Sequence, residues 1–179
     1  MKRNLMTAEI ARNYLSYNKE TGYLTYLERQ SVSHIRRYDA TKWNAKHAGK
    51  RACRLGHKGN IVVTLCDKVW LAHRIAWLIV TGEWPVDQID HINGNRSDNR
   101  WCNLRAANNS QNHANVGLLS SNTSGLKGAS WSKRYKKWVA QIGFNKMTIH
   151  LGRYDCPAAA HFAYLIAADK FFGEYARAA

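Results

Sequence analysis

Short apolar runs separated by polar stretches constrain the fold of this chain more than any other feature. The longest apolar runs are residues 75–80 and 157–168, well short of the roughly 20 apolar residues that cross a bilayer. We therefore interpret both runs as core helix segments. Residues 1–9 also lack the apolar core of a signal peptide. The sequence predicts a soluble protein of the cytoplasm with no membrane partner.

Length and composition favour a folded chain with reduced thiols. The chain has 179 residues, of which 45% are hydrophobic; this is enough for one ordinary domain or two small ones and excludes a wholly disordered protein. Cys53, Cys66, Cys102 and Cys156 lie far apart and form no C-x-x-C pair. They are expected to be reduced and mostly buried rather than to form a disulfide scaffold or a cysteine zinc site.

The charge balance indicates a polyanionic partner. Lys and Arg number 27 and Asp and Glu 12, which gives a net charge of +15. No acidic residue lies between Asp98 and Asp155, whereas nine Lys and Arg do. A surface of this kind attracts nucleic acid by long-range Coulomb forces and by release of condensed counterions.

The turn and loop signals between the apolar segments predict a mixed α+β chain in three parts. In the first part, Thr7 is expected to cap a helix, and the predicted elements are a helix at 7–17, a strand at 23–26, a basic irregular segment at 28–59, a hairpin formed by 60–65 and 69–73, and a buried helix at 74–80. The second part, 88–118, is rich in Asn, Asp and His; it is expected to hold an extended segment at 88–92, a turn at 93–95 and a helix at 103–115. In the third part, strands at 127–131, 138–144 and 147–154 are followed by a helix from Pro157 to Gly173 that can cover one face of their sheet.

One acid, one imidazole and two amides fall within 23 residues of the second part: Asp90, His91, Asn103 and Asn112. A strand places Asp90 and His91 on opposite faces, so that one can bind a metal while the other faces a water. The ordinary pKa of histidine makes His91 a candidate base, and the oxygens of Asp90 and Asn112 suit Mg²⁺ or Mn²⁺. Asn103 can pin the intervening loop through side-chain to backbone hydrogen bonds. The competing interpretation is a chance Asp-His dipeptide among turn and cap residues.

The motifs His-Arg-Ile-Ala-Trp at 73–77, Ile-Asp-His-Ile-Asn-Gly-Asn-Arg-Ser-Asp-Asn-Arg at 89–100, Asn-Leu-Arg at 103–105 and Ser-Gln-Asn at 110–112 resemble the HNH endonucleases of phages and mobile elements. The resemblance implies a ββα-metal (His-Me finger) catalytic unit. It implies Asp90 and Asn112 as ligands of one divalent metal, His91 as general base, Asn103 as the structural central Asn, and 5′-phosphate and 3′-hydroxyl ends. Neighbouring residues on a helix point about 100° apart, so either Asn112 or His113 faces the metal; the context favours Asn112. His73, at a predicted strand-to-helix junction, is interpreted as structural.

The motifs of residues 124–131, 137–142 and 149–154, followed by an Ala-rich helix, resemble an AP2 DNA-binding domain over 124–176. In that family a three-stranded antiparallel sheet lies in the major groove and one helix packs behind it. We favour a core position for Trp138. Arg105, beside the predicted active helix, is a candidate phosphate ligand. The DNA-facing set that the resemblance implies is Lys127, Trp131, Lys133, Arg134, Lys136, Gln141, Lys146, His150 and Arg153.

These patterns together predict a metal-dependent endonuclease of duplex DNA, with a nicking or homing-type activity and no small-molecule cofactor. The predicted division is a nuclease domain at 1–116, a linker at 117–123 and an AP2-like domain at 124–179. A monomer and a homodimer both remain open, and the resemblance suggests a phage setting and hence the host cytoplasm. The alternatives are a non-catalytic AP2-like DNA-binding regulator and an RNase; a sheet that reads a major groove argues against RNA.

Overall fold

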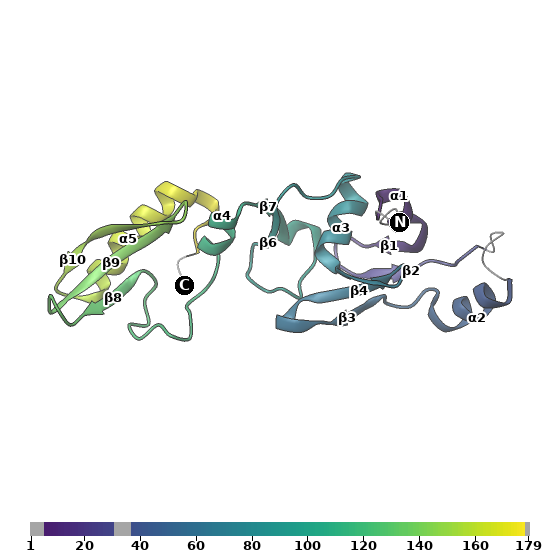
Figure 1. Cartoon of the computed structure of the whole chain (residues 1–179), viewed down its shortest axis with the longest axis horizontal. Coiled ribbons are helices and arrows are strands. Elements are labelled where there is room, and N and C mark those ends of the chain that lie inside the picture. The colour runs from purple at the N-terminus through teal and green to yellow at the C-terminus, as the bar shows by residue number, and fades with distance from the viewer. Residues whose placement is uncertain (1–5, 31–36, 178–179) are drawn as a thin grey trace. The chain divides into compact units, whose positions relative to one another are not determined.

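The computed structural model describes residues 6–30 and 37–177 and divides the chain into two compact units, Met1–Ala106 and Ala107–Ala179 (Figure 1). The first unit contains, in order, α1 (Ala8–Tyr14), β1 (Leu15–Tyr17), β2 (Leu24–Tyr26), α2 (Arg37–His47), β3 (Cys53–Leu55), β4 (Ile61–Leu65), β5 (Lys68–Leu71), α3 (Ala72–Thr81), β6 (Gln88–His91) and β7 (Leu104–Ala107), whose last residue opens the second unit. The second unit continues with α4 (Asn109–Ala114), β8 (Ala129–Ser132), β9 (Lys137–Phe144), β10 (Met147–Tyr154) and α5 (Pro157–Phe172). The mixed α/β class agrees with the prediction. No helix in the described ranges is long and apolar enough to cross a membrane.

Helix α1 is shorter than predicted. Thr7 caps it as expected, since its hydroxyl accepts a hydrogen bond from the backbone N–H of Ile10 at 3.2 Å. The helix ends at Tyr14, and Leu15–Tyr17 turn into a strand that pairs antiparallel with β2. Leu15 and Leu24 thereby become fully buried, and this burial favours the strand over a longer helix.

The main core of the first unit lies between the sheet β3–β4–β5 and helices α1 and α3. The predicted hairpin is confirmed as β4 and β5, which pair antiparallel. The predicted buried helix is confirmed as α3, although it starts two residues earlier. Val63, Ile75 and Leu78 are almost completely buried in this core.

The segment expected to be irregular contains helix α2. Nothing in its sequence lines up an apolar face, which is why the periodicity did not reveal it. The thiols also differ from expectation: all four cysteines are free, but Cys66, Cys102 and Cys156 are exposed and Cys53 is half-buried. The prediction of mostly buried thiols is therefore wrong.

Strands β6 and β7 form a two-stranded sheet joined by a long polar loop. The helix predicted at 103–115 is wrong, since Leu104–Ala107 is a strand and only Asn109–Ala114 is helical. Pairing with β6 and burial of Leu104 against Ala76 and Ile89 outweigh the local helical pattern. Asn108 then starts α4 with a capping box: its side chain accepts from the N–H of Gln111, whose own side chain accepts from the N–H of Asn108.

In the second unit, α5 packs on one face of the antiparallel sheet β8–β9–β10, as predicted (Figure 1). Ala129, Ala140 and Ala160 form a close contact between sheet and helix, and Ile142 packs near Tyr164. Helix α4 belongs to this unit, because Ala114 lies in its core. The division after Ala106 therefore lies earlier than the predicted boundary after residue 116, and the ββα-metal grouping of β6, β7 and α4 stays a prediction.

Candidate active site around Asp90 and His91

Strand β6 presents its side chains to two different environments. Ile89 contacts Ala76 of α3. Two residues further along the strand, the centroid of the His91 ring lies 5.0 Å from that of His73 on the same helix. His73 and Ala76 are three residues apart and share a helix face, while residues two apart share a strand face. Asp90, between them, instead contacts Arg105 of β7. The prediction that Asp90 and His91 lie on opposite faces agrees with these contacts.

The His91 imidazole is buried and fixed by a hydrogen bond. Its exposed fraction is 6%, and Nε2 lies 2.9 Å from Oδ1 of Asn99. A carbonyl oxygen only accepts, so Nε2 carries the proton and donates, and Nδ1 of the neutral ring is the basic nitrogen. Burial lowers the pKa of His91, and the hydrogen bond to Asn99 opposes this shift. The ring is therefore neutral at neutral pH and able to accept a proton.

The Asp90 carboxylate lies in a buried ion pair. Its Oδ2 accepts from Nε and Nη2 of Arg105 at 3.0 and 2.9 Å, and the two side chains are 5% and 12% exposed. Arg105 was predicted to contact phosphate, whereas the structure directs its guanidinium at Asp90. The carboxylate is thus held in place, with its negative charge compensated inside the unit.

Asn103 ties together the loop that follows β6. Its Oδ1 accepts from the N–H of Asn93 at 2.9 Å, and its Nδ2 donates to Oδ1 of Asn93 at 3.0 Å and to the carbonyl of Asp98 at 2.7 Å. Asn103 is buried and precedes β7 rather than opening a helix. The hydrogen bonds expected of a loop-pinning Asn are present.

Sequence reasoning gave no role to Asn99 and only a structural one to His73. Asn99 is only 3% exposed. Its position within the motif at 89–100 was the one sequence signal that could have pointed to a role for it. His73 is 7% exposed, and its Nδ1 is buried without a hydrogen-bond partner among the described residues. Burial, with smaller effects of His91 and Arg74, lowers the pKa of His73 to about 3. His73 therefore meets His91 as a neutral ring.

The metal ligands predicted by resemblance are divided between the units. Asp90 lies in the first unit, and Asn112 lies on α4 in the second. Among the described residues, no group of three or more His, Cys, Asp and Glu side chains is arranged to hold a metal. A divalent cation at Asp90 would instead rely on one carboxylate with amide, water and phosphate oxygens, and such hard oxygen donors fit Mg²⁺ or Mn²⁺.

The strand register divides the predicted DNA-facing residues of the second unit. Directly paired residues lie on the same face, and the pairs Gln141–His150 and Val139–Arg153 lie opposite the face that α5 covers. Gln141, His150 and Arg153 are exposed there. Trp131, in contrast, pairs with Trp138 on the side of the helix, with ring centroids 5.4 Å apart. Trp138 packs partly buried against the core as predicted.

The remaining basic residues of the set lie in turns, with one exception. Lys133, Arg134 and Lys136 belong to the β8–β9 turn and Lys146 to the β9–β10 turn, and all four are exposed. Tyr135, which sequence reasoning missed, lies under the guanidinium of Arg153, 3.5 Å from the ring centroid.

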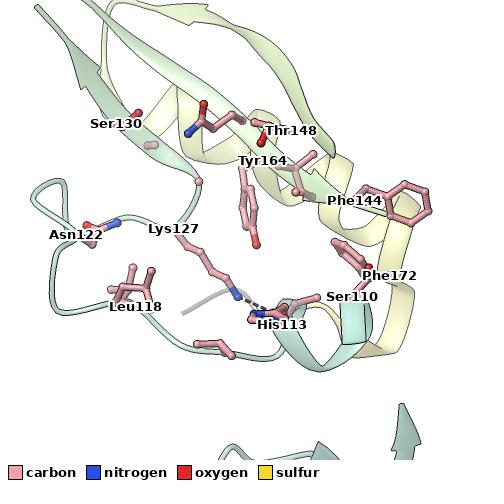
Figure 2. Close-up of a pocket in the computed structure, with 18 of the residues that line it drawn as sticks. Ser110, His113, Leu118, Asn122, Lys127, Ser130, Phe144, Thr148, Tyr164 and Phe172 are labelled. Carbon is pink, nitrogen blue, oxygen red and sulfur yellow. Dashed lines mark hydrogen bonds between the residues drawn. The ribbon is translucent and has the colours of Figure 1, made fainter. Parts of the chain in front are cut away.

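Lys127 is the exception. Its ammonium donates to the carbonyls of Ala114 and Arg177 at 2.6 and 3.0 Å, and burial lowers its pKa to about 8. Figure 2 shows this side chain reaching toward α4 in a pocket of about 700 Å³, which His113 and Tyr164 also line. The structure therefore directs Lys127 into the fold and not onto the sheet face.

Comparison with known proteins identifies the class of this site. Residues 71–114, which include α3, β6, β7 and α4, match the HNH endonuclease family and form an HNH endonuclease domain. The chain is similar to Protein 3.8 of Escherichia phage T7, with 43% identity over 71 residues that cover 39% of this chain and 59% of that protein. It is also similar to an uncharacterized HNH endonuclease, L560, of Acanthamoeba polyphaga mimivirus, with 33% identity over 123 residues that cover 68% of this chain and 63% of that protein. The chain thus spans about 60% of the length of these two relatives. No solved structure shows a significant match.

Proposed function

We propose that this protein is a metal-dependent endonuclease that hydrolyses phosphodiester bonds of duplex DNA. The observation that carries the proposal is the neutral, buried His91, fixed through Nε2 beside the Asp90 carboxylate within the HNH domain. Phosphodiester hydrolysis requires a base for water, charge stabilisation at the phosphate, and donors that hold the strand. The first unit supplies the base, and the basic composition of the chain supplies attraction for the strand.

His91 is the group that moves the proton. Asn99 keeps the proton on Nε2, so Nδ1 takes a proton from the attacking water. Asn103 holds the loop from Asn93 to Asp98 in one conformation through its three hydrogen bonds. Arg105 orients the carboxylate of Asp90.

Asp90 and Asn112 are the proposed ligands of one Mg²⁺ or Mn²⁺ ion, which when bound would stabilise negative charge on the phosphate and on the leaving 3′ oxygen. Products with 5′-phosphate and 3′-hydroxyl ends follow from this assignment. One site cuts one strand, so a monomer is expected to nick, and a homodimer or two successive events would be needed for a double-strand break. A homing-type role in a phage, in the cytoplasm of the host, is part of the same proposal.

The second unit is proposed to be an AP2-like module that binds duplex DNA through its open sheet face. Gln141, His150 and Arg153 lie on that face, and the basic turns extend it. Linking a second binding surface to the nuclease domain raises the effective concentration of the nuclease domain at its site.

One observation favours a different function, that of a non-catalytic DNA-binding regulator. The Asp90 carboxylate already pairs with Arg105, and a ligand committed to an ion pair binds a cation less readily. In that case the sheet face would bind DNA and the first unit would serve only as a scaffold.

A plasmid assay separates the two functions. Supercoiled plasmid is incubated with the protein in Mg²⁺, Mn²⁺ or EDTA, and open-circle and linear forms are resolved on a gel. The endonuclease converts plasmid to open circles only with a divalent cation; His91→Ala slows this by about 10²–10⁴-fold and leaves DNA binding nearly intact. His57→Ala, at an exposed histidine of the same unit, is the matched control and cuts like the wild type. Binding without cleavage in every buffer would instead establish the regulator.

A further inference from the structure

The hairpin formed by β1 and β2 precedes the HNH domain in sequence and contacts its central loop. The Tyr17 hydroxyl donates to the backbone carbonyl of Asn99 at 2.6 Å. The N–H of Trp101 donates to the carbonyl of Lys19 at 2.9 Å. Two segments about 80 residues apart in sequence are therefore joined at Asn99 and at Trp101, two residues further along the loop.

The tip of the hairpin also contacts the backbone at Asn99 directly. Gly22 adopts φ +74°, and a Cβ atom at this position would lie 2.4 Å from the carbonyl carbon of Asn99 and 2.5 Å from the nitrogen of Arg100. Only glycine fits without a shift of one of the two backbones. The hairpin and the loop are thus in direct backbone contact at this point, with no room for a side chain between them.

The side chain of Asn99 carries this placement to the candidate base. Its backbone is held by Tyr17 and Gly22, and its Oδ1 accepts the hydrogen bond from Nε2 of His91 at 2.9 Å. A shift of the Asn99 backbone changes the distance between Oδ1 of Asn99 and Nε2 of His91, because only two side-chain torsions separate Oδ1 from the Asn99 backbone. The three contacts form a continuous chain from the hairpin to the imidazole.

We propose that the β1–β2 hairpin is a positioning element of the active site, which acts through Asn99 to fix the tautomer and orientation of His91. The role of His91 as the base rests on the function proposed above; the effect of the hairpin on the imidazole does not. Tyr17, Gly22 and Asn99 are positioning residues and touch no substrate. When the acceptor moves away, Nε2–H loses its partner, and the tautomer with a proton on Nδ1, which cannot act as the base, becomes populated.

Two glycines offer a matched pair for the test. Gly22 and Gly49 have nearly equal positive φ values, +74° and +73°, so an alanine meets left-handed backbone strain at both; at Gly49, however, nothing outside its chain neighbours lies within 4 Å of the added Cβ. Gly22→Ala and Gly49→Ala are compared in the full chain. The protonation site of His91 is read from two-bond ¹H–¹⁵N correlations of the imidazole, assigned with His91→Gln, and plasmid nicking is measured in parallel.

We expect Gly22→Ala to populate the Nδ1–H tautomer of His91 and to slow nicking about tenfold or more, whereas Gly49→Ala matches the wild type in both measurements. Asn99→Leu gives the same tautomer change, and Asn99→Asp, which keeps an acceptor, restores Nε2–H. A wild-type tautomer in a folded Gly22→Ala overturns the role of the hairpin, and a wild-type tautomer in Asn99→Leu overturns the role of Asn99; either result refutes the proposal. If Gly22→Ala does not fold, Tyr17→Phe, which removes only the hydroxyl that donates to Asn99, replaces it in the test. A shifted His91 tautomer in Tyr17→Phe then supports the proposal, and a wild-type tautomer refutes it. A His91→Ala protein that still cuts refutes the proposed base and leaves the tautomer result to decide this inference.

Discussion

Replacing His73 by methionine tests whether α3 holds a neutral imidazole against His91. The folded protein keeps the pKa of His73 at about 3, while the unfolded chain has the ordinary value of about 6.5. The unfolded state therefore binds a proton first, so this contribution to stability is full above pH 6.5 and is lost as the pH falls toward 3. Between pH 6.5 and pH 5 the loss is 1.5 pH units at about 1.4 kcal/mol each, or about 2 kcal/mol. Methionine has no proton to bind and also removes a buried Nδ1 for which the described residues offer no hydrogen-bond partner, so its cost at pH 7.5 is small.

Urea unfolding at pH 7.5 and pH 5, followed by tryptophan fluorescence, measures the effect, because five of the seven tryptophans lie in the first unit. The wild type is expected to lose about 2 kcal/mol more than His73→Met over this interval. His91 is present in both proteins, so its own titration contributes to both curves. His57→Gln, at an exposed site, should follow the wild type. Parallel pH dependences for wild type and His73→Met would show that the His73 ring is protonated in the folded state and would refute the reasoning.

Further predictions concern the ion pair, a helix cap and the open sheet face. Arg105→Met removes the buried guanidinium partner of Asp90 and is expected to lower the unfolding free energy by about 3 kcal/mol; an unchanged urea midpoint would contradict the burial of this pair. Thr7→Ala removes the N-cap acceptor of α1 and should cost about 1 kcal/mol in the same assay, while Thr7→Ser should cost little. Arg153→Gln should weaken duplex binding and reduce the slope of log K against log salt concentration by the equivalent of about one phosphate contact. Lys170→Gln, at an exposed position of α5, should leave both the affinity and the slope unchanged.

The sequence predicted the parts of the fold that depend on local signals. Alternating apolar residues and turn signals identified β4, β5 and the sheet of the second unit, and the Thr7 cap marked the start of α1. The errors occur where long-range contacts decide. Leu104 and Ala107 have helical spacing, but pairing with β6 makes Leu104–Ala107 a strand, and α2 has no apolar periodicity to detect.

In the candidate site, too, local sequence patterns predicted some features, and long-range contacts decided the others. The alternation of a strand was sufficient to place Asp90 and His91 on opposite faces, and Asn103 was expected to pin the intervening loop through its side chain, as its hydrogen bonds to Asn93 and Asp98 do. No local pattern, however, shows that Arg105 reaches Asp90, or that Lys127 reaches inward to the carbonyl of Ala114. Long basic side chains have several partners within reach, and tertiary packing selects among them.

The contacts of β6 also explain how three consecutive residues of a short strand can all be buried. Ile89 is apolar, His91 is kept neutral by its surroundings, and Asp90 is compensated by Arg105, so the strand places no uncompensated charge in the interior. The same pairing would matter for the proposed DNA substrate, because a bare carboxylate beside the proposed base, His91, would repel a phosphate more strongly than one paired with Arg105. A cation that binds Asp90 must then compete with Arg105, and Arg105→Met should for this reason tighten Mn²⁺ binding even as it weakens the fold.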